Sequence, residues 1–192
     1  MKIGLMSDIH CNLEGLQGAL RELADCQELL CAGDLLYQYR FSTEVLALLE
    51  DRGVHAIVGN HDRTILHTSA HPLRASVDPA ALDYLATIPL TLSLEFDGLR
   101  VAMFHGAPWD DPTSISATYI YPENQADLRR VAQVDADVVV LGHTHRAFAT
   151  RINGTLIVNP GSCGEPRDGT DLLRCAILDT SDGQVEFRKW PQ

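Results

Sequence analysis

The sequence predicts an α/β fold in which two β-sheets pack face to face and helices cover their outer sides. In the first third of the chain, apolar runs of strand length alternate with helical segments, an order typical of a parallel sheet. In the second half, pairs of strand-like segments flank Asp-Gly and Asn-Gly dipeptides, which favour β-hairpins. The length of 192 residues fits one domain over residues 1–192.

The first third of the chain predicts three strands and two helices. The apolar strands cover residues 2–6, 28–32 and 54–58. Asn12 suits the N-cap of the first helix, because the leucines that follow it recur at helical spacing: Leu13, Leu16, Leu20 and Leu23. A second helix over residues 43–51 ends shortly before Gly53, a residue type favoured after a helix C-terminus.

The rest of the chain predicts a change from helices to hairpins. Residues 64–89 are less regular, with one helix over 79–87 that begins at Pro79. A helix over 123–133 precedes a buried strand over 137–141. The hairpin strands are 90–96 with 99–104, 146–152 with 155–158, and 172–179 with 184–190.

Composition restricts the environment and the partners of the protein. The formal charge of −11 creates a field that repels nucleic acids and anionic membranes, so nucleic-acid polymers are disfavoured as partners. Five cysteines without a Cys-x-x-Cys motif predict neither a disulfide framework nor a thiolate zinc site. Because no run of about 18 apolar residues exists and no signal-peptide core follows Lys2, we expect a cytoplasmic protein that spans no membrane.

Metal-type ligands follow five of the predicted strands, at the point where each strand ends. Each one alone is a weak signal, because a histidine pair or a single aspartate after a strand is usually an ordinary polar residue or a turn. Five of the eight histidines nevertheless fall in these segments. The residues are Asp8, His10, Asp34, Asn60, His61, Asp62, His105, His143 and His145.

We expect these side chains to meet at one site. The carboxyl ends of the strands in an open α/β sheet border the crevice in which ligands bind. Residues two apart in an extended chain point to the same side, so Asp8 with His10, and His143 with His145, are each expected to face one point. Glycines precede several of these residues and permit tight turns.

The ligand types predict a site for two divalent cations. Carboxylate, imidazole and amide ligands without thiolate favour Mn, Fe, Zn, Ni or Co, and argue against calcium or a structural zinc. Seven candidate ligands are too many for one ion and suit two. One aspartate can bridge two ions about 3.5–4 Å apart.

In order, the segments SDIH, GD, GNHD, HG and GHTH over residues 7–146 resemble the motifs of the calcineurin-like metallophosphoesterase superfamily. The later NPGS at residues 159–162 and the small size resemble its compact bacterial and archaeal phosphodiesterase branch. The resemblance implies a four-layer α/β/β/α sandwich, in agreement with the two-sheet prediction.

The resemblance also implies a role for each site residue. The first metal ion would be held by Asp8, His10, Asp34 and His145. The second would be held by Asp34, Asn60, His105 and His143, so that Asp34 bridges the pair. His61 would contact the phosphate and assist the leaving group, and Asp62 would orient His61 by a hydrogen bond.

The implied activity is that of a dinuclear-metal-dependent phosphoesterase, manganese being one candidate metal. The leading prediction is a phosphodiesterase that hydrolyses a small phosphate ester or nucleotide with metal-activated water. The alternatives are a phosphomonoesterase, a nuclease, or a non-catalytic scaffold, as in the retromer subunit that shares this fold. The filled ligand positions argue against the scaffold, and the acidic charge argues against the nuclease. The oligomeric state stays open, and a homodimer is one option.

Several residues near these motifs carry expectations of their own. Cys11, where many compact relatives have glycine, is expected to be a small residue packed under the site, and Arg146 is expected to point away from it. Asn159 and Ser162 either support the site or form a simple turn. The remaining expectations are partial burial for Trp109 and surface or loop positions for His55, His67 and His71.

Overall fold

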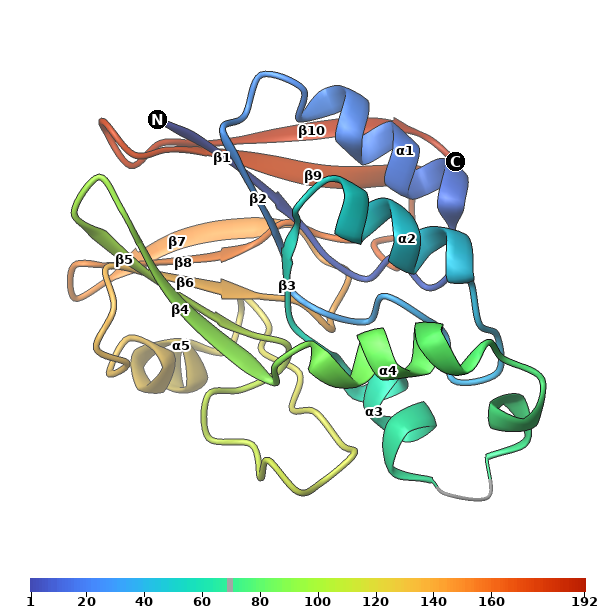
Figure 1. The fold of residues 1–192 in the computed structure, drawn as a ribbon. Coiled ribbons are helices and arrows are strands. Elements are labelled where there is room, and N and C mark those ends of the chain that lie inside the picture. Colours follow the sequence, from blue (N-terminus) through green and yellow to red (C-terminus); the bar gives the residue numbers. More distant parts are fainter. Residues whose placement is uncertain (69–70) are drawn as a thin grey trace.

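The computed structural model describes residues 1–68 and 71–192, and in these ranges the strands form two mixed sheets of five strands each (Figure 1). The first sheet has the order β10-β9-β1-β2-β3 and the second the order β4-β5-β6-β8-β7. The first sheet contains β1 (Lys2–Met6), β2 (Glu28–Cys31), β3 (His55–Ala56), β9 (Leu172–Asp179) and β10 (Val185–Pro191). The second contains β4 (Thr91–Phe96), β5 (Leu99–Phe104), β6 (Val138–Leu141), β7 (Phe148–Ile152) and β8 (Thr155–Asn159).

Helices cover the outer face of each sheet, which gives the expected four-layer α/β/β/α sandwich. Figure 1 shows α1 and α2 against the first sheet and α5 on the outer side of the second. The helices are α1 (Leu13–Glu22), α2 (Thr43–Asp51), α3 (Asn60–His67), α4 (Pro79–Thr87) and α5 (Gln125–Val131), with a short 3₁₀ helix η1 (Pro72–Ala75). As predicted, Asn12 caps α1, because its side chain accepts the backbone N–H of Gly15 at 2.8 Å.

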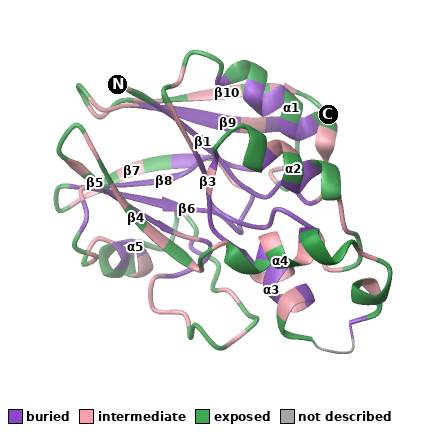
Figure 2. Ribbon diagram, viewed as in Figure 1, coloured by how far each residue is buried: buried purple, intermediate pink, exposed green. Residues whose placement is uncertain are grey.

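The central layer of the core lies between the two sheets. Alternate residues of β1 point into it, so Ile3 and Leu5 pack against valines of the second sheet such as Val138 and Val140. Met6 belongs instead to the cluster under the helices of the first sheet. Figure 2 shows the central strands buried along most of their length. Each such aliphatic side chain contributes about 1.5–3 kcal/mol on burial, which fixes both the strand register and the strand ends.

The centre of each sheet is parallel. Strands β1, β2 and β3 run in one direction, and so do β5, β6 and β8. The carboxyl ends of β1, β2 and β3 therefore lie together at one end of the first sheet, and those of β5, β6 and β8 lie together at one end of the second. The candidate ligands follow these carboxyl ends.

The structure corrects several sequence-based boundaries. The third strand is restricted to β3, because Val58 no longer pairs with β2 and its N–H donates to the carbonyl of Pro89. Residues 60–67, which carried no helix prediction, form α3, and helix 123–133 is shortened to α5. The irregular stretch 64–89 contains residues 69–70, which lie outside the described ranges.

The three histidines outside the motifs agree only in part with the expectation of surface or loop positions. His55 is a strand residue of β3 and contacts Glu28 at 3.1 Å. His71 is buried, and its side chain accepts the N–H of Leu73 at the start of η1. His67 is exposed at the end of α3. Within the described ranges, none of the helices has the length and apolar character needed to cross a membrane.

Candidate metal centre

The loops that follow the strands are joined to one another by backbone hydrogen bonds. The N–H of Asp8 donates to the carbonyl of Gly33 at 2.9 Å, and the N–H of His10 donates to that of Asp34 at 3.0 Å. On the second sheet, the N–H of Gly142 donates to the carbonyl of His105 at 3.0 Å. Neighbouring loops are thereby held in register, and their side chains are brought to one place.

The side chains converge through left-handed backbone, which corrects the extended-chain expectation. The φ angles of Asp8 and His10 are 56° and 49°, and those of His143 and His145 are 68° and 57°. Asp34 is also left-handed, with φ of 52°. Non-glycine residues adopt this region at a cost of about 1–2 kcal/mol each. The buried contacts of the site stabilise this unfavourable backbone.

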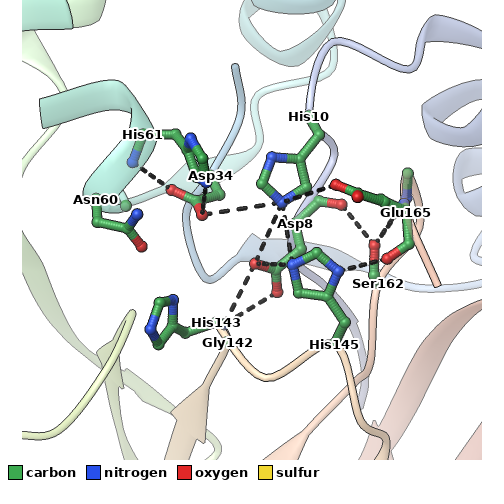
Figure 3. Close-up of polar contacts among 12 residues, drawn as sticks. Asp8, His10, Asp34, Asn60, His61, Gly142, His143, His145, Ser162 and Glu165 are labelled. Carbon is green, nitrogen blue, oxygen red and sulfur yellow. Dashed lines mark hydrogen bonds and ion pairs between the residues drawn. The ribbon is translucent and has the colours of Figure 1, made fainter. Parts of the chain in front are cut away.

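The first group of ligands consists of Asp8, His10 and His145 (Figure 3). Nε2 of His145 lies 3.3 Å from Oδ1 of Asp8 and 3.0 Å from Nε2 of His10. Oδ2 of Asp34 lies 3.9 Å from Nε2 of His10, so Asp34 also borders this group. These atoms face a common point, as the resemblance implied for the first metal ion.

The second group consists of Asp34, His105 and His143, whose ligand atoms lie within 4.8 Å of one another. Nε2 of His105 lies 3.2 Å from Oδ2 of Asp34 and 3.1 Å from Oδ1 of Asn60. Asp34 is therefore the carboxylate that borders both groups. This is the position that a bridging ligand requires.

Backbone carbonyls fix the tautomers of two histidines. Nδ1 of His105 contacts the carbonyl of Ala32 at 2.7 Å, and Nδ1 of His145 contacts that of Glu165. Because a carbonyl only accepts, each Nδ1 carries a proton. In the neutral imidazole the Nε2 lone pair is then free, and it points toward the carboxylates.

The electrostatics of the centre favour cations. Burial lowers the pKa of His10 to about 4, and burial with the neighbouring His105 lowers that of His143 to about 4, so both imidazoles are neutral at pH 7. Burial opposes a charge on His105, but the Asp34 carboxylate outweighs it and raises the pKa of His105 to about 10. In the absence of a metal, the proton on Nε2 of His105 balances the charge of the Asp34 carboxylate. A divalent cation at this place would replace that proton and balance the same charge.

One observation independent of the motifs indicates that the residues fit a divalent cation. Nε2 of His143 is buried and has no hydrogen-bond partner in the part of the chain that the structure describes. A buried polar nitrogen without a partner costs free energy unless something else satisfies it. A cation held with Asp34 and His105 would do so, and the oxygen and nitrogen donor set suits a transition metal.

His61 forms a third group of potential ligands with His10 and Asp34, and a backbone N–H determines which of its ring nitrogens carries the proton. The N–H of Gln38 donates to Nδ1 of His61 at 3.2 Å, so the neutral ring carries its proton on Nε2. That Nε2 lies 3.9 Å from Oδ2 of Asp34. Burial lowers the pKa of His61, which favours this neutral form.

The resemblance predicted a hydrogen bond between Asp62 and His61, and this prediction is wrong in this structure. The Asp62 carboxylate instead accepts the N–H groups of Gly59, Leu35 and Leu36 at 2.8, 3.1 and 2.8 Å. Burial and the charge of Asp34 raise the pKa of Asp62 to about 7, against the effect of these donors. Asp62 therefore caps α3 and ties it to the loop that carries Asp34.

Two glycines allow the loops to approach this closely. A Cβ on Gly59 would lie 2.2 Å from Oδ1 of Asp34, and a Cβ on Gly142 would lie 2.3 Å from Oγ of Ser7. No side chain fits at either place. The GN and GH dipeptides of the sequence are thus a steric requirement of the centre.

The NPGS segment supports the centre, which decides between the two expectations for it. The side-chain amide of Asn159 donates to the carbonyl of Gly142 at 2.7 Å and so holds the turn before His143. The hydroxyl of Ser162 donates to the carbonyl of Asp8 at 2.7 Å and accepts the N–H of Glu165 at 2.7 Å. The loop after β8 is thereby fixed against the loop after β1.

Glu165 is a site residue that the sequence analysis missed. Its carboxylate points toward His10, with Oε2 4.0 Å from Nε2 (Figure 3). Arg167 pairs with the same carboxylate at 3.1 Å. Its only sequence signal is its place three residues after Ser162, in the loop that NPGS begins.

The remaining expectations concern residues at the edge of the centre. Arg146 points to Glu123 at 2.6 Å, away from the ligands, and Trp109 is partly buried under Arg130. Cys11 is half-buried, and burial raises its pKa to about 11. Its Sγ accepts the N–H of Tyr37 at 3.3 Å, so Cys11 packs beside the centre as expected.

Comparison with known proteins extends over almost the whole chain. A probable metallophosphoesterase of Methanothermobacter thermautotrophicus is 27% identical over 173 residues, 87% of this chain and 80% of that protein. The phosphodiesterase MJ0936 of Methanocaldococcus jannaschii is 25% identical over 194 residues, 98% of each chain. The crystal structure of a metallophosphoesterase from Sphaerobacter thermophilus has the same fold, with a TM-score of 0.78, 23% identity, and coverage of 99% of this chain and 88% of that one. The calcineurin-like phosphoesterase superfamily domain matches residues 1–183, and this protein belongs to that superfamily.

Proposed function

We propose that this protein is a phosphodiesterase that hydrolyses small phosphate esters with two divalent cations. The observation that carries the proposal is the place of Asp34, whose Oδ2 lies 3.9 Å from His10 in one group and 3.2 Å from His105 in the other. Membership in a phosphoesterase superfamily and the similarity to an archaeal protein named as a phosphodiesterase support the reaction class.

The proposed ligands divide between the two groups. Asp8, His10, Asp34 and His145 would hold the first cation, and Asp34, Asn60, His105 and His143 would hold the second. When bound, the cations supply positive charge to the phosphoryl oxygens and lower the pKa of a water that attacks phosphorus. Manganese is one candidate, with iron, zinc, nickel and cobalt equally suited to these ligands.

The chain itself supplies a proton donor. The Nε2–H of His61 faces the centre, because the N–H of Gln38 occupies Nδ1. We assign His61 to donate this proton to the leaving oxygen as its bond to phosphorus breaks. Asp62 acts through structure, since its carboxylate ties Gly59 to the loop of Asp34.

The shared core between the two sheets supports one domain over residues 1–192, with the centre at the junction of both sheets. A non-catalytic scaffold is less well supported. The candidate ligands and His61 are all present, and their atoms converge.

The test is reconstitution of metal-free protein with Mn, Ni, Zn, Fe or Mg, each alone. We expect hydrolysis of bis(p-nitrophenyl) phosphate to return with at least one metal and to exceed that of p-nitrophenyl phosphate. The Asp34→Asn variant is the control, and we expect it to lose the activity. Metal binding without hydrolysis of either ester would favour the scaffold, and full activity of Asp34→Asn would exclude the assigned bridge.

A further inference from the structure

The exposed large apolar side chains lie in loops that contribute residues to the metal centre. Among the described residues they are Tyr39, Ile115, Tyr119 and Tyr121, with exposed fractions of 69, 45, 46 and 38%. All four lie in two loops, residues 32–42 and 105–124, which contain the site residues Asp34 and His105 (Figure 1). The three exposed tyrosines are connected by ring contacts to the site histidines His61 and His143, and exposed apolar groups beside a site mark a place where a ligand binds.

The first loop places tyrosines against His61. The ring of Tyr37 stacks on the imidazole of His61, with 4.8 Å between centroids and 21° between planes. Tyr39 meets Tyr37 edge-on at 5.8 Å and is the most exposed of the large apolar residues. An aromatic surface thus leads from the proposed proton donor outward to solvent.

The second loop places tyrosines against His143. Tyr119 stacks on His143 with 3.9 Å between centroids, and Tyr121 lies parallel to Tyr119 within 5° at 5.8 Å. This second aromatic surface starts at a proposed ligand of the second cation. The two surfaces therefore begin on different sides of Asp34, and each ends at an exposed ring.

An arginine accompanies each pair of rings. The guanidinium of Arg40 lies 5.4 Å from the centre of the Tyr37 ring, and that of Arg146 lies 5.5 Å from the Tyr121 ring. In a chain of net charge −11, Arg40 offsets repulsion of a phosphate near the centre, because its guanidinium also donates to the carbonyl of His10. The charge of Arg146 is instead neutralised by Glu123. Planar guanidinium groups also stack on aromatic rings and on bases.

We propose that these two tyrosine pairs bind the base of a nucleotide whose phosphate lies at the metal centre. The inference rests on the proposed function and narrows its substrate class to esters that carry a nucleobase. Sequence-tolerant stacking on exposed tyrosines is how proteins hold single bases, since every base has a π-face. A phosphate diester with two alkyl groups has no base that could stack on either tyrosine pair.

The test compares two phosphates that differ only by the base. Isothermal titration of the Mn-loaded protein with AMP and with ribose 5-phosphate needs no turnover. We expect AMP to bind at least about fivefold more tightly, which corresponds to the lower end of the range for loss of one base stack. In Tyr39→Ala or Tyr121→Ala, the affinity for AMP should fall to that for ribose 5-phosphate, and the affinity for ribose 5-phosphate should stay unchanged. The Tyr39→Phe and Tyr121→Phe variants keep an aromatic ring and should still bind AMP more tightly than ribose 5-phosphate.

Loss in one alanine variant alone would support the proposal and show which pair holds the base. Equal affinities for the two phosphates, failure of both to bind, or equal weakening of both in the alanine variants would overturn it. The proposal would also be overturned if the wild-type protein sedimented as a dimer and either alanine variant sedimented as a monomer, because the rings would then contact a second copy of the chain. Failure of the proposed function shows separately, as absence of diester hydrolysis by the wild-type protein.

Discussion

Oδ2 of Asp34 lies 3.2 Å from Nε2 of His105, although Asp34 follows a strand of the first sheet and His105 follows a strand of the second. The contact exists because the two sheets pack face to face and their parallel strands end at one place. The candidate centre is therefore a product of the sandwich. A change that separates the two sheets would also separate the two ligand groups.

Replacement of Gly59 tests how closely the loops must approach. A Cβ at residue 59 would lie 2.2 Å from Oδ1 and 2.4 Å from the backbone N of Asp34. We expect Gly59→Ala to displace Asp34, lower the free energy of unfolding by about 1–3 kcal/mol, and weaken binding at both cation sites. Isothermal titration with Mn and thermal denaturation measure the two effects.

The matched control for that variant is Gly169→Ala. Gly169 has a left-handed φ of 79°, and nothing lies within 4 Å of the added Cβ. We expect Gly169→Ala to lower the free energy of unfolding by about 1–2 kcal/mol, because alanine is strained in left-handed backbone, and to leave metal affinity unchanged. Normal metal binding by Gly59→Ala would show that Asp34 does not need its present position.

Replacement of His61 tests the proton donor through the leaving group. In His61→Asn, we expect kcat for an alkyl ester to fall by about 10²–10⁴-fold, the usual effect of a general acid. An ester of p-nitrophenol should be affected much less, because its leaving oxygen needs no proton. Steady-state rates on both esters, with metal content measured in parallel, give the comparison. Equal losses of kcat on the two esters would exclude His61 as the proton donor to the leaving oxygen.

Loss of the Ser162 hydroxyl tests the loop after β8. The hydroxyl donates to the carbonyl of Asp8 and accepts the N–H groups of Gly164 and Glu165, all in a buried position. We expect Ser162→Ala to lower the free energy of unfolding by about 1–3 kcal/mol, because it leaves buried groups unpaired. Urea denaturation measures this, with the exposed Ser181→Ala as control. A stability equal to that of the control would mean that the loop repairs these bonds elsewhere.

Removal of one negative charge tests the role of Glu165. Its Oε2 lies 4.0 Å from Nε2 of His10, close enough for its charge to act on a cation in the first group. We expect Glu165→Gln to weaken Mn binding at one of the two sites by about tenfold, since charges a few Å apart interact by 1 kcal/mol or more. Glu186→Gln, from an exposed ion pair with Arg188, is the control. Matching affinities in both variants would remove Glu165 from the centre.

The sequence was sufficient for the parts of the fold that depend on local pattern. The Asp-Gly and Asn-Gly turns marked the hairpins β4–β5, β7–β8 and β9–β10, and the apolar runs marked the buried parallel strands. The sequence analysis did not predict helix α3, because His61 and Asp62 were interpreted as site residues in a loop after the strand. Its cap is an aspartate at the third helical position, which accepts the N–H of Gly59. That spacing was present in GNHD and could have been used.

The geometry of the site depended on contacts that no local pattern encodes. The convergence of Asp8 with His10 was expected from an extended chain, whereas the structure achieves it with left-handed residues. The partner of Asp62 could not be read from its neighbour His61, because its donors come partly from residues 35 and 36 of another loop. Glu165 was missed for the same reason, since it reaches His10 only through the packing of β8 beside the centre.

The most direct test is an anomalous difference map at the manganese edge from crystals of the Mn-loaded protein. The assignment of Asp34 as the bridge predicts two peaks about 3.5–4 Å apart, with the Asp34 carboxylate bound to both. It would be contradicted by a single peak, by peaks away from the two ligand groups, or by two ions of which Asp34 touches only one.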